Sequence, residues 1–307
     1  MAQAWMKIGT RGSPLALAQA HETRRLLAAA HGIPEDQIEI VIIKVMGDQI
    51  LDRPLSEAGG KGLFTKEIDL AQLDGSIDIA VHSSKDLPTI LPDGLEIGGF
   101  LPREDVRDAF ISLRAKSLMD LPEGALVGTA SLRRQALVRK LRPDLRVGLL
   151  RGNVQTRLSK LQSGECDATL LALAGLKRLN LTQHVTEVLS DESFLPAVGQ
   201  GAIGITVRSD DHETRVRLGA ILHPETGHAL TLERAFLRVL DGSCRTPIAG
   251  LARVNKDQIS FRGLILRKDG SEFYETQASG TIAEAQRLGV QAGQDLLSRA
   301  PADILTH

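Results

Sequence analysis

The sequence predicts an α/β protein with two similar units, followed by a smaller α+β unit. Over residues 6–84, apolar runs of strand length alternate with helical patterns, and the same alternation returns over 124–173. From about residue 223 the order changes to a helix, three consecutive strand-like runs and a closing helix. Alternating strands and helices are typical of a parallel sheet covered by helices, whereas consecutive strands flanked by helices indicate an α+β domain.

The first unit contains a helix whose two ends are marked by suitable residues. Ser13 suits the N-cap, Pro14 suits the first turn, and Gly32 suits the C-terminal stop. The β-branched run IEIVIIKV at 38–45 is typical of a strand buried on both faces. The other elements expected here are strands at 6–12 and 77–84 and a helix at 65–75.

Two short echoes indicate that the second unit repeats the plan of the first. GTRGS at 9–13 resembles GTAS at 128–131, and each joins a strand to a helix. GSID at 75–78 resembles GECD at 164–167, and each joins a helix to a strand. The elements expected in the second unit are strands at 124–130, 145–150 and 166–173 and helices at 131–141 and 154–164.

The last unit begins at a plausible boundary, HPETG at 223–227. A helix leads from there to Gly242, and the Asp-Gly pair at 269–270 marks a turn between two strands. The strands expected are 247–254, 258–267 and 272–280, with a closing helix at about 281–299.

The overall composition disfavours several classes of protein. The 307-residue chain carries 37 basic and 38 acidic side chains, which gives a formal net charge of −1, and only 3% of its residues are aromatic. A nucleic-acid-binding protein would usually be clearly basic, so no nucleic-acid partner is expected. No apolar run reaches the roughly 18 residues of a membrane span, and the N-terminus lacks the features of a signal peptide. We therefore expect a cytoplasmic protein with no membrane partner.

Cations and hydroxyls follow the predicted strands, at the edge where an open α/β sheet binds its ligands. Arginine binds carboxylate or phosphate through a planar fork, and helix N-termini add N–H donors. A solvated helix face explains any one of these residues, but their recurrence in both units favours a polyanion site. They are Thr10, Arg11, Ser13, Ser83, Ser84, Lys85, Thr129, Ser131, Arg133, Arg134, Arg151, Arg157, Lys177 and Arg178, and Gly152 and Asn153 follow Arg151 at the same strand end.

The glycine-rich stretch EAGGKGLFTKE at 57–67 contains Lys61 and Phe64 but lacks the spacing of a phosphate-binding Walker sequence. It is either a plain surface loop or a mobile lid that presents a cation and an aromatic face, and its three glycines favour the lid.

One carboxylate, Asp86, lies among the predicted anion-binding residues. An aspartate in a turn is usually a cap or solvated, but in a cationic cleft it would stabilise positive charge that develops in a transition state. His82, at the end of the preceding strand, is expected to have a hydrogen-bonding role. The eight histidines show no metal-ligand spacing, so no metal is expected.

The two cysteines, 78 positions apart, form neither a CxxC pair nor a zinc-type pair. Cys166 matches Ile77 in the echo at the entry to a strand, so a small buried apolar side chain is expected. Cys244 follows a helix end and Gly242 and lies beside Arg245, a position that suits an accessible thiol.

Eight segments, taken in order along the whole chain, resemble those of the porphobilinogen deaminases, also called hydroxymethylbilane synthases. The most specific is the cofactor-attachment signature, in which Glu233-Arg234 and an apolar helix turn precede GSCRTP at 242–247. The other segments are TRGSPLALAQ, GGKGLF, DIAVHSSKDLP, GTASLRRQ, RGNVQTRL, LALAGLKRL and LPAVGQGA.

The resemblance implies three domains. Domains 1 and 2 would be doubly wound α/β domains like type II periplasmic binding proteins, and domain 3 would be an α+β domain with a three-stranded antiparallel sheet. Domain 1 would be completed by a returning segment, and PAVGQG would be a hinge. The implied boundaries are 1–101 with 202–219 for domain 1, 106–195 for domain 2 and 223–307 for domain 3.

The resemblance also implies a monomeric enzyme of tetrapyrrole biosynthesis. Cys244 would carry a dipyrromethane through a thioether, four porphobilinogen molecules would add to it with loss of ammonia, and a linear tetrapyrrole would be released. Asp86 would be the catalytic carboxylate. The binding residues would be Arg11, Ser13, Lys61, Phe64, Ser83, Lys85, Thr129, Ser131, Arg133, Arg134, Arg151, Gly152, Asn153, Arg157, Arg178 and Gln200.

Two other kinds of function remain open on the residues alone. A solute-binding protein without chemistry would need the two α/β units but neither the third unit nor Cys244. A cysteine-nucleophile hydrolase or acyltransferase needs a base near the thiol. No histidine lies within 243–250, although His223 or His228 is a candidate.

Overall fold

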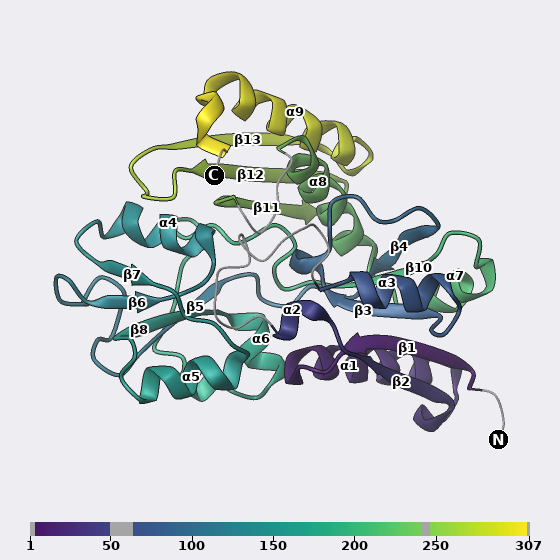
Figure 1. Cartoon of the computed structure of the whole chain (residues 1–307). Helices are drawn as coiled ribbons and strands as arrows, with labels where there is room; N and C mark the ends of the chain where they lie inside the picture. Colours follow the sequence, from purple (N-terminus) through teal and green to yellow (C-terminus); the bar gives the residue numbers. More distant parts are fainter. Residues whose placement is uncertain (1–3, 50–63, 241–245, 306–307) are drawn as a thin grey trace. The chain divides into compact units, whose positions relative to one another are not determined.

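The computed structural model describes residues 4–49, 64–240 and 246–305, and Figure 1 shows their path. The predicted residues Lys61 and Cys244 lie outside these ranges. The chain divides into two compact units. Among the described residues, the first unit contains 4–49, 64–104 and 202–227, and the second contains 105–201, 228–240 and 246–305.

The first unit is built on a five-stranded sheet in the order β2-β1-β3-β10-β4. Strand β1 pairs in parallel with β2 and β3, and β10 runs antiparallel to both β3 and β4. Helix α1 packs against β1 and β3. The strands are β1 Met6–Arg11, β2 Ile38–Ile43, β3 Ile79–Ser83, β4 Leu95–Phe100 and β10 Ile203–Arg208; the helices are α1 Pro14–His31, α2 Met46–Gln49, α3 Lys66–Leu73 and α7 His212–Gly219.

The second unit contains a sheet of the same plan, in the order β7-β6-β8-β5-β9. Here β6 pairs in parallel with β7 and β8, and β5 runs antiparallel to β8 and β9. The strands are β5 Asp108–Ser112, β6 Leu126–Gly128, β7 Arg146–Gly148, β8 Ala168–Ala172 and β9 Glu187–Val188; the helices are α4 Leu132–Leu141, α5 Val154–Gln162 and α6 Leu173–Arg178.

The short GxxD echo performs the same task in both sheets. Gly75 and Gly164 end a helix at the same backbone angle, φ of 79°, which a side chain would strain. Three residues later, Asp78 accepts from the N–H of Lys7 at 2.7 Å, and Asp167 accepts from the N–H of Leu126 at 2.7 Å. Each aspartate thereby ties the start of its own strand to the neighbouring parallel strand. The echo therefore reflects a structural duplication.

The C-terminal part of the second unit contains a three-stranded antiparallel sheet in the order β11-β12-β13. The buried carboxylate of Glu233 accepts from the N–H groups of Gly199 and Ala252, each at 2.8 Å, and so joins α8 to β11 and to the segment before β10. The elements are α8 Pro224–Val239, of which residues 224–227 belong to the first unit, β11 Ile248–Asn255, β12 Gln258–Leu266, β13 Phe273–Thr281 and α9 Ala285–Arg299.

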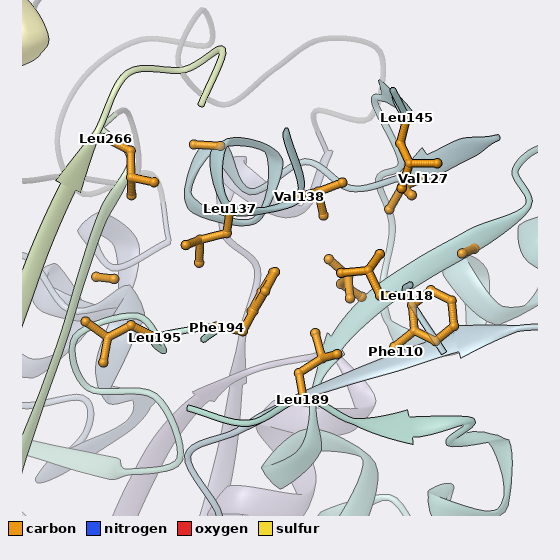
Figure 2. Packing of buried hydrophobic residues seen from close by; sticks show 14 of the residues in the cluster. Phe110, Leu118, Val127, Leu137, Val138, Leu145, Leu189, Phe194, Leu195 and Leu266 are labelled. Carbon is orange, nitrogen blue, oxygen red and sulfur yellow. The ribbon is translucent and has the colours of Figure 1, made fainter. Parts of the chain in front are cut away.

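A large apolar cluster lies in this second unit. Leu137 and Val138 of α4 pack with Phe194 and with Leu266 of β12, as Figure 2 shows. Helix α4 is also tied to the β12–β13 turn, because Arg139 donates to the carbonyl of Lys268 at 2.7 Å. Helix α4 therefore contacts both the five-stranded and the three-stranded sheet of this unit.

The predicted α/β class, with two sheet units and a C-terminal three-stranded antiparallel sheet, is confirmed. Two details are different. The sheets are mixed and not wholly parallel, because β10 and β5 enter antiparallel. The prediction that 38–45 is buried on both faces is wrong. Strand β2 is the edge strand of its sheet, and 57% of Ile42 is exposed.

Candidate functional site

In the first unit, three predicted site residues lie together, two from the ends of β1 and β3 and the third, Phe64, from just before α3. Arg11 is the last residue of β1, and Asp86 closes the single turn of 3-10 helix, Ser84–Asp86, that follows β3. The Arg11 Nη1 atom lies 3.9 Å from Asp86 Oδ2, and the guanidinium lies 4.3 Å from the centre of the Phe64 ring. The side chain of Asp86 is 32% exposed, so this carboxylate is open to a ligand.

Two predicted serines of this unit, Ser13 and Ser83, make hydrogen bonds within the unit. Ser13 caps α1, and its Oγ accepts from the N–H of Ala16 at 3.4 Å. Ser83 and Gln19 exchange hydrogen bonds of 3.0 and 3.1 Å between β3 and α1. Gln19 is 3% exposed and was not identified from the sequence, where it reads as one more polar residue of an amphipathic helix. Lys85 lies in the same 3-10 turn as Asp86.

His82 lies beneath this arrangement and is neutral. It is 6% exposed, and its Nε2 lies 3.5 Å from the hydroxyl of Thr206, which in turn donates to Gln72 Oε1 at 2.8 Å. Burial, and then the nearby charge of Arg11, lower the pKa of His82 to about 4. Both effects disfavour the imidazolium, so His82 supplies hydrogen bonds and no charge at neutral pH.

In the second unit, a buried aspartate gathers three of the predicted site residues. Arg133 Nη2 lies 2.8 Å from Asp108 Oδ2, and Arg134 Nη2 lies 2.6 Å from Oδ1. The amide Nε2 of Gln200 donates to Asp108 Oδ1 at 3.2 Å and to the carbonyl of Val106 at 2.7 Å. Asp108 was not identified from the sequence, since its only signal is its place at the start of the apolar run DAFIS.

The cluster around Asp108 has one positive charge in excess, because two guanidinium groups face one carboxylate. Burial alone would raise the pKa of Asp108, but the two arginines outweigh it and lower this pKa to about 2. Burial lowers the pKa of Arg133, and Asp108 opposes that shift. The Nε atom of Arg133 is buried and has no hydrogen-bond partner among the described residues.

The remaining predicted residues lie at helix ends in the same unit. Ser131 caps α4 and Asn153 caps α5, with Asn153 Oδ1 accepting from the N–H of Thr156 at 2.8 Å. Gly152 has φ of 119°, and a side chain there would clash with Thr156. Thr129 is buried after β6, and Arg151, just before α5, is 9% exposed. Arg157 Nε donates to the Gly152 carbonyl at 2.8 Å, and Arg178 Nη1 donates to the Gly201 carbonyl at 3.2 Å.

Cys166 is 6% exposed and packs in the apolar cluster beside β8, as the echo with Ile77 predicts. Within the ranges that the structure describes, no three His, Cys, Asp or Glu side chains are placed to hold a metal ion. Nor is any helix of those ranges both long and apolar enough to cross a membrane.

Comparison with known proteins decides the family. Residues 6–216 match the family model described as porphobilinogen deaminase, dipyromethane cofactor binding domain, and residues 228–298 match the C-terminal domain of the same enzyme. The chain belongs to the porphobilinogen deaminase family.

Relatives in that family extend over nearly the full chain. The porphobilinogen deaminase of Nitrobacter winogradskyi is 61% identical over 299 residues, which are 97% of this chain and 95% of the relative. That of Nitrobacter hamburgensis is 60% identical over the same shares. Among solved structures, a periplasmic substrate-binding protein from Coxiella burnetii matches with a TM-score of 0.45 and 14% identity, over 71% of this chain and 92% of its own.

Acidification should destabilise the protein through His82. An unfolded chain protonates this histidine near pH 6.5, while the folded protein resists protonation until about pH 4. Its contribution to stability is therefore complete above pH 6.5 and is lost as the pH falls toward 4, by up to about 3 kcal/mol. Urea denaturation of wild type and His82→Asn between pH 7 and 4.5 measures this loss. The variant should show a flatter acid slope, and exposed His21→Asn should keep the wild-type slope; equal slopes for wild type and His82→Asn would contradict the assignment.

Proposed function

We propose that this chain condenses four porphobilinogen molecules, with loss of ammonia, into the linear tetrapyrrole hydroxymethylbilane on a dipyrromethane bound through Cys244. Family membership over 97% of the chain supports the activity. The observation that carries the proposal is the pairing of the Asp86 carboxylate with Arg11, whose guanidinium also lies over the Phe64 ring. Cys244 lies outside the described residues, so its thioether rests on the attachment signature.

The basic residues explain how the chain would hold its ligand. Each porphobilinogen unit brings an acetate and a propionate, so negative charge accumulates as the product grows. Guanidinium and ammonium groups neutralise this charge, while hydroxyls, amides and backbone N–H groups orient the carboxylates. We assign these roles to Arg11, Ser13, Lys61, Ser83, Lys85, Thr129, Ser131, Arg133, Arg134, Arg151, Gly152, Asn153, Arg157, Arg178 and Gln200. Phe64 would present an aromatic face to the ligand.

The residues of the second unit fit a carboxylate-bearing cofactor. The Asp108 cluster has one positive charge in excess, and Arg133 has a buried Nε–H group that lacks a partner among the described residues. A buried donor without an acceptor is costly, and an anionic ligand oxygen would relieve that cost. When bound, the dipyrromethane supplies the pyrrole ring onto which the porphobilinogen units are added. Arg133 and its neighbours would hold the carboxylates of that group.

Asp86 would act on the reacting atoms. Loss of ammonia leaves a positively charged pyrrole intermediate, and the addition of the next ring produces a second cation and releases a proton. A carboxylate beside the pyrrole N–H groups stabilises both cations and assists the proton transfer. Arg11 and Phe64 would keep the Asp86 side chain turned toward the ligand, since Arg11 contacts both.

The wider setting follows from the same family membership. We propose that the enzyme is a cytoplasmic monomer that takes the small molecule porphobilinogen as substrate and uses neither a metal nor a nucleic acid. We also propose the three-domain division at 1–101 with 202–219, 106–195 and 223–307. In that division the antiparallel strand β10 completes the first domain.

The attachment of the cofactor can be tested by intact mass spectrometry. Purified wild type should exceed its sequence mass by two linked pyrrole units, and Cys244→Ser should show the bare sequence mass. Cys166→Ser is the matched control, because the Cys166 thiol is buried in the second unit and should not affect the adduct. A wild type without an adduct, or an adduct that survives in Cys244→Ser, would overturn the proposed attachment.

The role of Asp86 can be tested by replacing only its charge. Asp86→Asn should fold and retain the adduct, but kcat for porphobilinogen should fall by about 100- to 10,000-fold, because the cations lose their counter-charge and the proton its acceptor. Asp93→Asn removes an exposed carboxylate of the same unit and should leave kcat unchanged. Residual activity within tenfold of wild type in Asp86→Asn would remove Asp86 from the mechanism.

A further inference from the structure

Asp108 is the first residue of β5 and is fully buried. Its carboxylate contacts Arg133 and Arg134 of α4, and it also accepts from Gln200, which lies in the segment 196–201 before β10. All three contacting residues belong to the predicted ligand-binding set, yet Asp108 itself does not. One buried side chain therefore fixes three residues from two separate segments.

Each arginine is held at two points. Arg133 Nη1 donates to the carbonyl of Leu195 at 2.8 Å, and Arg134 Nη1 donates to the carbonyl of Leu170 in β8 at 2.9 Å. Arg134 also donates to Asp108 Oδ1 through both Nε and Nη2, so the plane of its guanidinium is defined. Arg133 has the ion pair with Asp108 Oδ2 as its second contact. For Arg133 this geometry leaves Nε as the nitrogen without a partner among the described residues.

The chain also places Asp108 itself firmly. Strand β5 pairs with β8 at Asp108↔Ala172, and the N–H of Leu189 donates to the Asp108 carbonyl at 2.9 Å. Next to Gln200, the N–H of Gly199 donates to the buried Glu233 at 2.8 Å. The carboxylate and the segment that carries Gln200 are thus both fixed from outside the cluster.

We propose that Asp108 is a positioning residue, which holds Arg133, Arg134 and Gln200 in the orientation that binds the carboxylates of the growing pyrrole chain. The inference deepens the proposed function and rests on it. A carboxylate that only neutralised buried charge would need no contact with an uncharged amide, whereas Asp108 also accepts from Gln200. Asp108 does not touch the substrate, and its effect passes through the three residues it orients.

The test compares Asp108→Asn with Asp167→Asn in the complete enzyme. Asp167 is the matched control, because it lies just before β8 of the same sheet and its carboxylate contacts Leu126 at the start of β6 and the exposed Arg114. Circular dichroism and thermal denaturation report the fold, intact mass reports the fraction of molecules that carry the adduct, and initial rates give KM and kcat at a temperature well below both transitions. A purely structural loss lowers the amount of active enzyme, and so lowers kcat while KM stays constant.

We expect folded Asp108→Asn either to carry the adduct in less than about a tenth of its molecules or to show a KM for porphobilinogen raised at least about tenfold. Asp167→Asn should keep the adduct and the wild-type KM. If Asp108→Asn does not fold, Asp108→Glu keeps the charge but displaces the guanidinium groups by one methylene, and it should show the same rise in KM. A variant at position 108 that is fully loaded and keeps the wild-type KM would overturn the proposal.

Wild type in the same experiment separates this inference from the proposed function. A wild type with neither adduct nor turnover would refute the function and the inference with it. An active, loaded wild type beside an unaffected Asp108 variant would refute the positioning role alone.

Discussion

The buried ion cluster of Asp108 with Arg133 and Arg134 is the interaction on which the second unit depends. Charged groups are costly to bury, and they remain in an interior only when partners and hydrogen bonds offset the loss of hydration. Here the carboxylate binds both guanidinium groups, and each of these also donates to a backbone carbonyl. The cluster thereby joins β5 and β8 to the start of α4, the helix that packs between two sheets.

Both units contain an aspartate carboxylate beside arginine guanidinium groups, but the two carboxylates differ in exposure. In the first unit Asp86 lies 3.9 Å from Arg11 and remains 32% exposed, so its carboxylate is available to a ligand. In the second unit Asp108 is fully buried, so its carboxylate orients other side chains. The duplicated sheets supply a common frame for both arrangements, since Asp78 and Asp167 fasten equivalent parallel strands in the same way. The exposed carboxylate of the first unit is the one that we propose acts on the ligand, and the buried carboxylate of the second unit is the one that we propose orients binding residues.

The sequence predicted those features that depend on residues close to one another in the chain. The caps of α1 at Ser13 and Gly32, the three C-terminal strands and the strand ends that carry Arg11 and Asp86 all follow from residues close in sequence. The antiparallel strand β10 was not predicted from its own residues, because its pairing of Ile203 with Ser83 joins positions far apart in the chain. The edge position of β2 and the proposed role of Asp108 were not predicted, for the same reason. Burial and partners at those places are set by distant segments.

We propose that the basic residues of the two units serve stepwise condensation and not ligand binding alone. The most direct test of this proposal is the stoichiometry of turnover, measured as ammonia released and linear tetrapyrrole formed when the purified enzyme meets porphobilinogen. We expect four molecules of ammonia for each hydroxymethylbilane released, with the enzyme returning to its starting mass. Porphobilinogen that binds without release of ammonia, or ammonia release without a linear tetrapyrrole, would contradict it.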